Sequence, residues 1–309
     1  MSEPDPKVER SRLANAAKER LTADLDHVLG ERFTRKGREK VDFYVDGIVV
    51  SSFTLFDRPE VDQVERDPYI ESAFNARRRI GLIVMRQLTL NASPAAGDRG
   101  TTTVSRTGPP GSKREPSTGR SMMAAVESIM ESSDGWPLNL RNWVESLDGA
   151  GRAAVVATTI AWCEGALRLV GTDPRITWTD PQYSSPLDLP GRRVRLQANI
   201  DAAMGTLGTG ERLFVVSEAL PSPRERITAG FVALVRAIGA GAAPERVTIG
   251  APSRGSMERY EVTEELLELA VDQVIETVAR AADIRSLAES GLNSESKSTT
   301  ESHVLKESQ

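Results

Sequence analysis

The sequence predicts an α/β fold in which a mixed central sheet is covered by helices on both faces. Residues 151–170 form the most apolar long segment, and their length and alanine content favour a buried helix. Residues 192–220 follow and have the pattern of two adjacent strands. Residues 224–281 then give a helix, a strand, a short final strand and a last helix. A helix between two strands of one sheet indicates a parallel crossover beside the antiparallel pairs.

The composition narrows the function classes. The chain has 309 residues, enough for one large domain or two small ones, and a formal net charge of -5. This charge gives no global case for a nucleic-acid or membrane-surface partner, although it leaves local basic patches open. Cys163 is the sole cysteine, so a disulfide framework and a thiolate zinc cluster are excluded. With His27 and His303 as the only histidines, a Ser-His-Asp or Cys-His site has few candidates.

The amino terminus is charged and has no apolar signal core. No run of the sequence approaches the length that a membrane-spanning helix needs. We therefore expect a cytoplasmic protein without a membrane partner.

Residues 1–90 predict a small α+β segment. An amphipathic helix is expected over residues 8–29, and a hairpin that turns at an Asp-Gly pair is expected in residues 41–55. A second helix is expected from about residue 68 to residue 90, with three consecutive arginines at 77–79. Three successive residues cannot share one helix face, so these arginines do not predict a continuous phosphate-binding stripe.

Two polar segments delimit the second predicted domain, residues 121–284. Residues 91–120 are dominated by Pro, Gly, Ser and Thr and predict a flexible linker or disordered loop. Residues 285–309 predict a disordered polar tail.

Two observations inside the second domain favour packing over chemistry. Trp136 and Trp143 are close enough in sequence to stack nucleic-acid bases, but core packing is favoured because no basic or alternating strand accompanies them. Cys163 follows Trp162 inside the apolar helix, which favours a buried and inert thiol over a nucleophile.

The strands of this domain are predicted from alternation and from apolar runs. A short strand at 176–178 is followed by a Pro-rich turn. Residues 194–200 alternate apolar and polar side chains, as a half-buried strand does. Glycines in residues 205–210 supply the next turn, and the continuous apolar run at 213–216 is typical of a strand covered on both faces.

This order of elements, together with two short motifs, resembles the PD-(D/E)XK nuclease superfamily and its RecB-type branch. The resemblance covers about residues 151–281, roughly two fifths of the chain. It implies a restriction-endonuclease-like core in which an acid at the end of the second strand binds a divalent metal. Asp201, in the stretch QANIDAAMG, matches this acid, and Glu164 matches the glutamate that the preceding helix often supplies. The resemblance thus implies that Asp201 and Glu164 are the metal ligands of any surviving Mg²⁺ site.

The third strand departs from the family pattern of an acid, a spacer and a lysine. Ser217, Glu218 and Ala219 occupy these places. A hydroxyl is a weak ligand for a hard cation, and Ala219 has no polar group. Glu218 is one residue out of place, so we predict that it points to the opposite face of the strand. Arg224 or Arg226, at the start of the next helix, is the candidate substitute for the lysine.

Asp201, Glu218 and Arg224 are therefore the candidate catalytic residues, in a site that looks degenerate. The interpretation is a catalytically degenerate nuclease-like module, a pseudoenzyme without a cofactor, that associates with nucleic acid such as DNA or docks on a protein partner. One alternative is an active Mg²⁺-dependent nuclease with a rearranged site. The other is an adaptor or assembly subunit that binds no nucleic acid.

Overall fold

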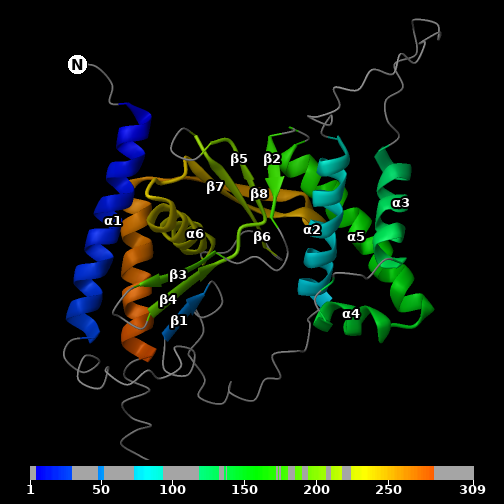
Figure 1. Ribbon diagram of the computed structural model, residues 1–309, viewed down its shortest axis with the longest axis horizontal. Coiled ribbons are helices and arrows are strands. Elements are labelled where there is room, and N and C mark those ends of the chain that lie inside the picture. Colours follow the sequence, from blue (N-terminus) through cyan, green and yellow to red (C-terminus); the bar gives the residue numbers. More distant parts are fainter. Residues whose placement is uncertain are drawn as a thin grey trace, which may run out of the picture.

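A five-stranded mixed sheet packed against helices forms the centre of the structure (Figure 1). The computed structural model describes residues 5–29, 48–51, 73–92, 118–131, 136, 138–171, 173, 175–179, 185–189, 194–206, 210–217 and 224–281. The predicted hairpin partner at 41–47, most of the predicted linker and the predicted tail at 285–309 lie outside these residues.

The central sheet has the strand order β2-β5-β6-β7-β8. Its strands are β2 (Ile176–Trp178), β5 (Ala202–Met204), β6 (Arg212–Val216), β7 (Arg246–Ala251) and β8 (Ser256–Glu261). Only β6 and β7 run parallel, and helix α6 (Arg224–Ala240) connects them. The crossover helix and the mixed sheet that the sequence predicts are confirmed.

A second, three-stranded sheet has the order β1-β4-β3. It consists of β1 (Ile48–Ser51), β3 (Ser185–Leu189) and β4 (Val194–Ala198), with β1 parallel and β3 antiparallel to β4. β3 falls in the stretch interpreted from sequence as a Pro-rich turn. Its proline, Pro186, is tolerated because β3 is an edge strand of its sheet.

The prediction that strand 194–200 lies beside strand 213–216 is wrong. The neighbour of β6 is β5, whereas β4 belongs to the other sheet. The sequence pattern misleads because the alternation of β4 runs on into Ile200, which is also buried, although the chain changes sheets there. The predicted turn at 205–210 connects β5 to β6, and Gly205 and Gly210 both have positive φ angles.

The first hydrophobic core surrounds α6, which contacts strands of both sheets. Almost every side of α6 is buried, as expected for a helix enclosed by other elements. Helix α1 (Pro6–Leu29) and the last helix, residues 264–281, cover its outer side (Figure 1). Ion pairs join these two helices, with Arg12 2.9 Å from Glu264 and Arg20 2.5 Å from Asp272.

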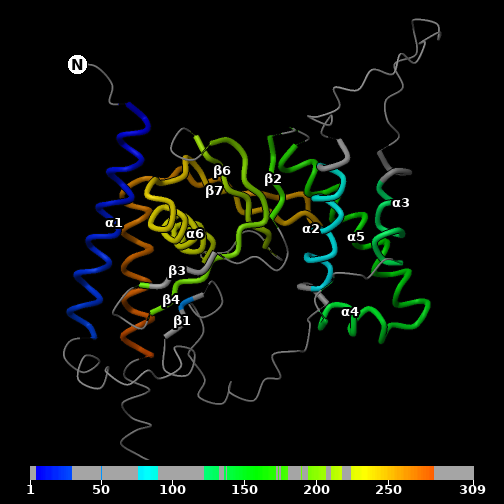
Figure 2. Tube along the Cα trace, in the orientation of Figure 1, coloured from blue at the N-terminus to red at the C-terminus, as the bar shows by residue number. Residues whose placement is uncertain are grey.

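The second core lies on the other face of the central sheet (Figure 2). It contains α2 (Ala73–Ala92), α3 (Thr118–Glu131), α4 (Leu138–Glu145) and α5 (Gly149–Val170). Helices therefore cover both faces of the sheet. Trp136 is buried and Trp143 packs against this core, so the expected packing role of the two tryptophans is confirmed.

Two close contacts, each at a glycine, set the position of α5 against its neighbours. A Cβ on Gly81 of α2 would lie 2.4 Å from the Trp162 ring, and a Cβ on Gly165 would lie 2.1 Å from the carbonyl oxygen of Pro252. Glycine at both positions lets α5 approach α2 on one side and the turn after β7 on the other.

Elements from the first 90 residues contribute to both cores and to the second sheet. The domain limits themselves stay a prediction. By length and composition alone α5 is long and apolar enough to cross a membrane, which differs from the sequence expectation. Since a core helix of a soluble protein meets the same criterion, and α5 packs against α2 and α3, this is weak evidence.

Candidate functional site

Asp201, the acid on which the nuclease resemblance depends, is completely buried just before β5. Its backbone N–H donates to the carbonyl of Phe214 at 2.9 Å, and its carbonyl accepts from the N–H of Thr179 at 2.9 Å. The backbone of Asp201 therefore continues the pairing of β5 with strands on both sides.

Both carboxylate oxygens of Asp201 are occupied by partners within the protein. Oδ1 lies 2.5 Å from an Nη of Arg78, which reaches over from α2 and is itself only 15% exposed. Oδ2 accepts a hydrogen bond of 2.7 Å from the backbone N–H of Val216. A divalent ion at this carboxylate would have to compete with a guanidinium in a buried position, where separating the pair is costly.

The other predicted site residues do not gather around Asp201 in the part of the chain that the structure describes. Glu164 is exposed on α5, and Arg224 is exposed at the first residue of α6. No three His, Cys, Asp or Glu side chains within the described ranges come close enough together to hold a metal ion. Glu218 and Ala219 lie outside these ranges, so the orientation predicted for Glu218 stays a prediction. The N–H of Ser217 donates to the carbonyl of Gly250 at 2.9 Å and so extends the β6–β7 pairing.

Cys163 is buried, and burial raises the pKa of its thiol to about 12, with a further contribution from the charge of Glu164. The prediction that this thiol is buried is confirmed, and its inertness stays a prediction that the raised pKa supports. Neither Cys163 nor Asp201 is accessible as a reactive group.

Arg78 was not predicted from the sequence as the partner of Asp201. A partial sequence signal was present, because three consecutive helical arginines cannot share one face. An arginine on the packed side of such a helix needs a buried anion as its partner. The sequence contained no indication that the anion would be Asp201, because Asp201 lies 123 residues after Arg78 in the chain.

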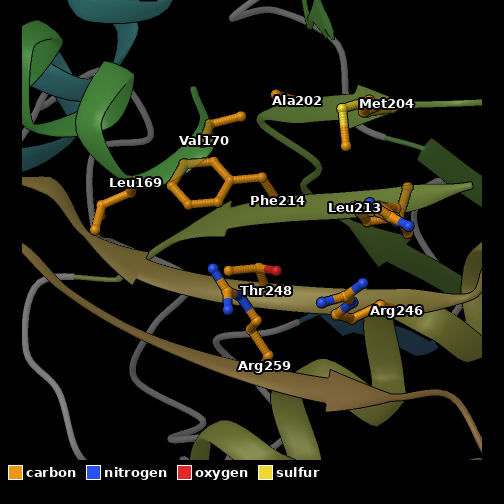
Figure 3. Close-up of a pocket in the computed structure, with 11 residues that line it drawn as sticks. Leu169, Val170, Ala202, Met204, Leu213, Phe214, Arg246, Thr248 and Arg259 are labelled. Carbon is orange, nitrogen blue, oxygen red and sulfur yellow. The ribbon is translucent and has the colours of Figure 1, made fainter. Parts of the chain in front are cut away.

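A pocket with a basic wall lies on the face of the central sheet that the second core covers, at the end of α5 (Figure 3). Strand register places Met204, Arg212 and Arg246 in one row across β5, β6 and β7. The next row contains Ala202, Phe214, Thr248 and Arg259 on β5 to β8. The cavity has a volume of about 290 Å³, and the end of α5 closes one side through Leu169 and Val170.

Three arginines form the basic wall, and none of the described residues that line the pocket is acidic. Arg212 lies 3.3 Å from a carboxylate oxygen of Glu245, and Arg246 lies 3.2 Å from one of Glu261. Arg259 is exposed and forms no ion pair with any residue that the structure describes. Figure 3 shows the guanidinium groups of Arg246 and Arg259, from neighbouring strands, on either side of Thr248. The wall therefore holds one cation whose charge is not balanced locally.

The opposite wall of the pocket is apolar. It consists of Leu169 and Val170 from α5, Met204 from β5 and the largely buried ring of Phe214 from β6. The Phe214 ring meets Trp178 edge-on, with centroids 6.4 Å apart and planes at 79°, and this fixes its orientation. The arrangement suits a ligand with an anionic group and an apolar or flat body.

The pocket extends along β6 from Arg212 to Phe214, whose carbonyl accepts the N–H of Asp201. Arg212 is the first residue of this strand and Val216, the partner of Asp201, is the last. Four residues of a strand span about 13 Å. The Arg212 end of the pocket is therefore distant from the carboxylate of Asp201, although the lining extends to Ala202, which follows Asp201 directly.

No protein-family model, no curated protein and no solved structure matches this chain, so the evidence for its function is the geometry of these two places on the sheet.

Proposed function

We propose that the chain is a binding module without nuclease activity, built on a PD-(D/E)XK-like core, that associates with nucleic acid through its phosphate groups. The observation that carries the proposal is the presence of three arginines from three adjacent strands in one pocket without an acidic lining residue. Arginine binds phosphate oxygens with paired N–H donors, so this is suitable chemistry for a phosphate backbone.

The surroundings of Asp201 support a non-catalytic role. Hydrolysis of a phosphodiester by a metal ion requires carboxylates that are open to the ion. The Asp201 carboxylate instead neutralises Arg78 and accepts the N–H of Val216. In this proposal the ancestral metal-binding acid has become a structural link between α2 and the central sheet.

The direct test is the binding of fluorescently labelled single-stranded and double-stranded oligonucleotides, measured by anisotropy over a range of salt concentrations. We expect binding that weakens as salt rises, because arginine–phosphate contacts release counterions. The double variant Arg246→Gln/Arg259→Gln should bind at least about tenfold more weakly and should show a shallower salt dependence.

The chain offers a matched control for this variant. Arg152 is exposed in the first turn of α5, and the pocket lies at the other end of that helix. Eighteen helical residues separate Arg152 from Val170, a distance of about 27 Å along the helix axis. Arg152→Gln should keep the affinity of the parent protein, since it removes one positive charge, half of what the double variant removes, at a distance from the pocket. Equal losses in both variants would show that only the net charge matters.

The two alternative functions give different outcomes. An active nuclease would cleave plasmid DNA in Mg²⁺ or Mn²⁺, and Asp201→Asn would abolish the cleavage. We expect no metal-dependent cleavage. An adaptor would bind no oligonucleotide of either kind even at low salt, and that result would overturn the proposed function.

A further inference from the structure

We infer that the basic pocket recognises the phosphate monoester of a single nucleotide, either as a free nucleoside monophosphate or as the phosphorylated end of a strand. This inference deepens the proposed function and rests on it for the nucleic-acid source of the ligand. It assigns the pocket to terminal phosphate groups and not to the internal phosphodiesters of a strand that runs across the sheet.

The size of the pocket favours one small ligand. A volume of about 290 Å³ is at the lower end of the range found for small-molecule pockets. Leu169 and Val170 close it at the end of α5, and β5 to β8 form its floor. A bound strand would have to leave past the α5 end on one side, whereas a terminal nucleotide has a single connection to the rest of the strand.

The number of donors favours a monoester. A phosphate monoester has three terminal oxygens and a charge of about -1.5 to -2 at neutral pH, whereas a diester has two such oxygens and one charge. Arg212, Arg246 and Arg259 lie on adjacent strands and can each direct N–H groups at a different oxygen. The charge of the dianion also matches the charge of the wall. Three arginines line this wall, and glutamates pair with two of them, Arg212 and Arg246.

Thr248 adds a fourth donor at the centre of this wall. It lies on β7 directly opposite Arg259 on one side and Phe214 on the other. Its side chain is half-buried, and its hydroxyl makes no hydrogen bond to the residues that the structure describes. Thr248 lines the pocket, so its hydroxyl is available to a phosphate oxygen.

The apolar wall provides the place for the nucleoside. Val170 and Met204 are partly exposed, so a flat ring can pack against them. Apart from the arginines, which the phosphate would occupy, the described lining has no side chain of the types that commonly read base edges by hydrogen bonds, such as Asn, Gln, Asp or Glu. We therefore expect the pocket to accept all common bases with affinities that differ only a few-fold.

The test has two parts, both followed by calorimetry or by NMR shifts of the protein. In the first, the probes are nucleoside monophosphates, the corresponding nucleosides and inorganic phosphate. We expect the monophosphates to bind at least about tenfold more tightly than either fragment. If phosphate alone binds as well as the nucleotide, the apolar wall contributes nothing and the inference is wrong.

In the second part, the probes are single-stranded oligonucleotides of one sequence with a 5′-phosphate, a 3′-phosphate or two hydroxyl ends, and the same sequence as a circle. Preference for a phosphorylated end supports the inference and identifies the end. A circle that binds as tightly as the phosphorylated strand overturns it, while the proposed function stands. Binding of free nucleotides without binding of any oligonucleotide supports the pocket assignment and overturns the proposed function.

Variants tie the signal to the pocket. Arg259→Gln removes the arginine that forms no ion pair with the described residues and should lower monophosphate affinity about tenfold or more, with little effect on the nucleoside alone. Thr248→Val keeps the shape of the side chain and should produce a smaller loss, since it removes one neutral donor. Arg152→Gln should leave both affinities unchanged. Tighter binding of an acidic peptide than of any nucleotide would assign the pocket to a protein partner and overturn the inference.

Discussion

Arg78 on α2 and Asp201 before β5 form a buried ion pair, with an Nη of Arg78 2.5 Å from Oδ1 of Asp201. Asp201 is fully buried and also accepts the N–H of Val216, so the pair connects the helical layer to the central sheet. The same acid is the residue that the nuclease resemblance assigns to a metal. Its fixed partner explains why the proposed function is binding and not hydrolysis.

Breaking this pair should destabilise the protein strongly. Arg78→Met leaves a buried carboxylate without its cation and should lower the free energy of unfolding by about 3–5 kcal/mol. Asp201→Asn leaves the guanidinium of Arg78 without its anion and should have a similar effect. The double variant should recover part of the loss, because it removes both charges, and a double-mutant cycle in urea would measure this coupling. Arg12→Met, which breaks an exposed pair with Glu264, should have a far smaller effect. Strictly additive losses would contradict a direct interaction.

The approach of α5 to Pro252 predicts a steric effect at Gly165. The Cβ introduced by Gly165→Ala would lie 2.1 Å from the Pro252 carbonyl oxygen and 2.7 Å from its carbonyl carbon, so backbone must shift. The overpacking should cost about 2 kcal/mol or more, which outweighs the helix propensity of alanine. Gly149→Ala is the matched control, because nothing lies within 4 Å of its Cβ position. It should leave the thermal midpoint unchanged or raise it slightly.

The buried thiol of Cys163 should make the free energy of unfolding depend on pH in the alkaline range. Burial raises the thiol pKa from 9.0 to about 12, so the folded state keeps the thiol protonated where the unfolded state loses its proton. The stabilisation is complete below about pH 9 and is lost as pH rises toward 12. Urea unfolding across this range should show a decline that Cys163→Ala reduces. A disulfide reagent should modify the thiol only after denaturant is added, and rapid modification of the folded protein would be incompatible with this burial.

Removing the charge of Glu245 should raise the affinity of the pocket for anions. Its carboxylate lies 3.3 Å from Arg212 and 3.8 Å from Arg246, so it competes with any anion for both arginines. Glu245→Gln should raise the affinity for nucleoside monophosphates by about two- to fivefold, with the largest gain at low salt. Glu268→Gln on the last helix removes an exposed charge outside this pocket and serves as the control. A loss of affinity in Glu245→Gln would mean that Glu245 positions the arginines.

The helices were the part of the fold most accessible from the sequence. The 3.6-residue periodicity and the apolar run predicted α1, α5 and α6 to within a few residues, because each buries a face or is enclosed. Strand partners were less accessible, since alternation identifies a strand without identifying its neighbour. The chain switches sheets between Ala198 and Ala202, and no Gly or Pro marks the change.

The candidate site shows the same limit. Asp201 was identified from its local motif, whereas its partner Arg78 depends on how α2 packs over the sheet. The basic pocket was missed because Arg212, Arg246 and Arg259 are scattered in sequence and meet only through the register of β6, β7 and β8. Isolated arginines on strands have the same sequence pattern as an ordinary solvent-facing side of a sheet.

The pairing of α1 with the last helix has a consequence for how the protein is made. Arg12 and Glu264, which join these helices, are 252 residues apart in sequence. The apolar face of α1, with Leu21 and Leu25 fully buried, therefore stays uncovered until nearly the whole described chain has left the ribosome. Contacts of such long range form late and slow folding. Helix α1 should therefore be among the last helices to dock, and the nascent chain should be a client for chaperones that hold exposed apolar helices.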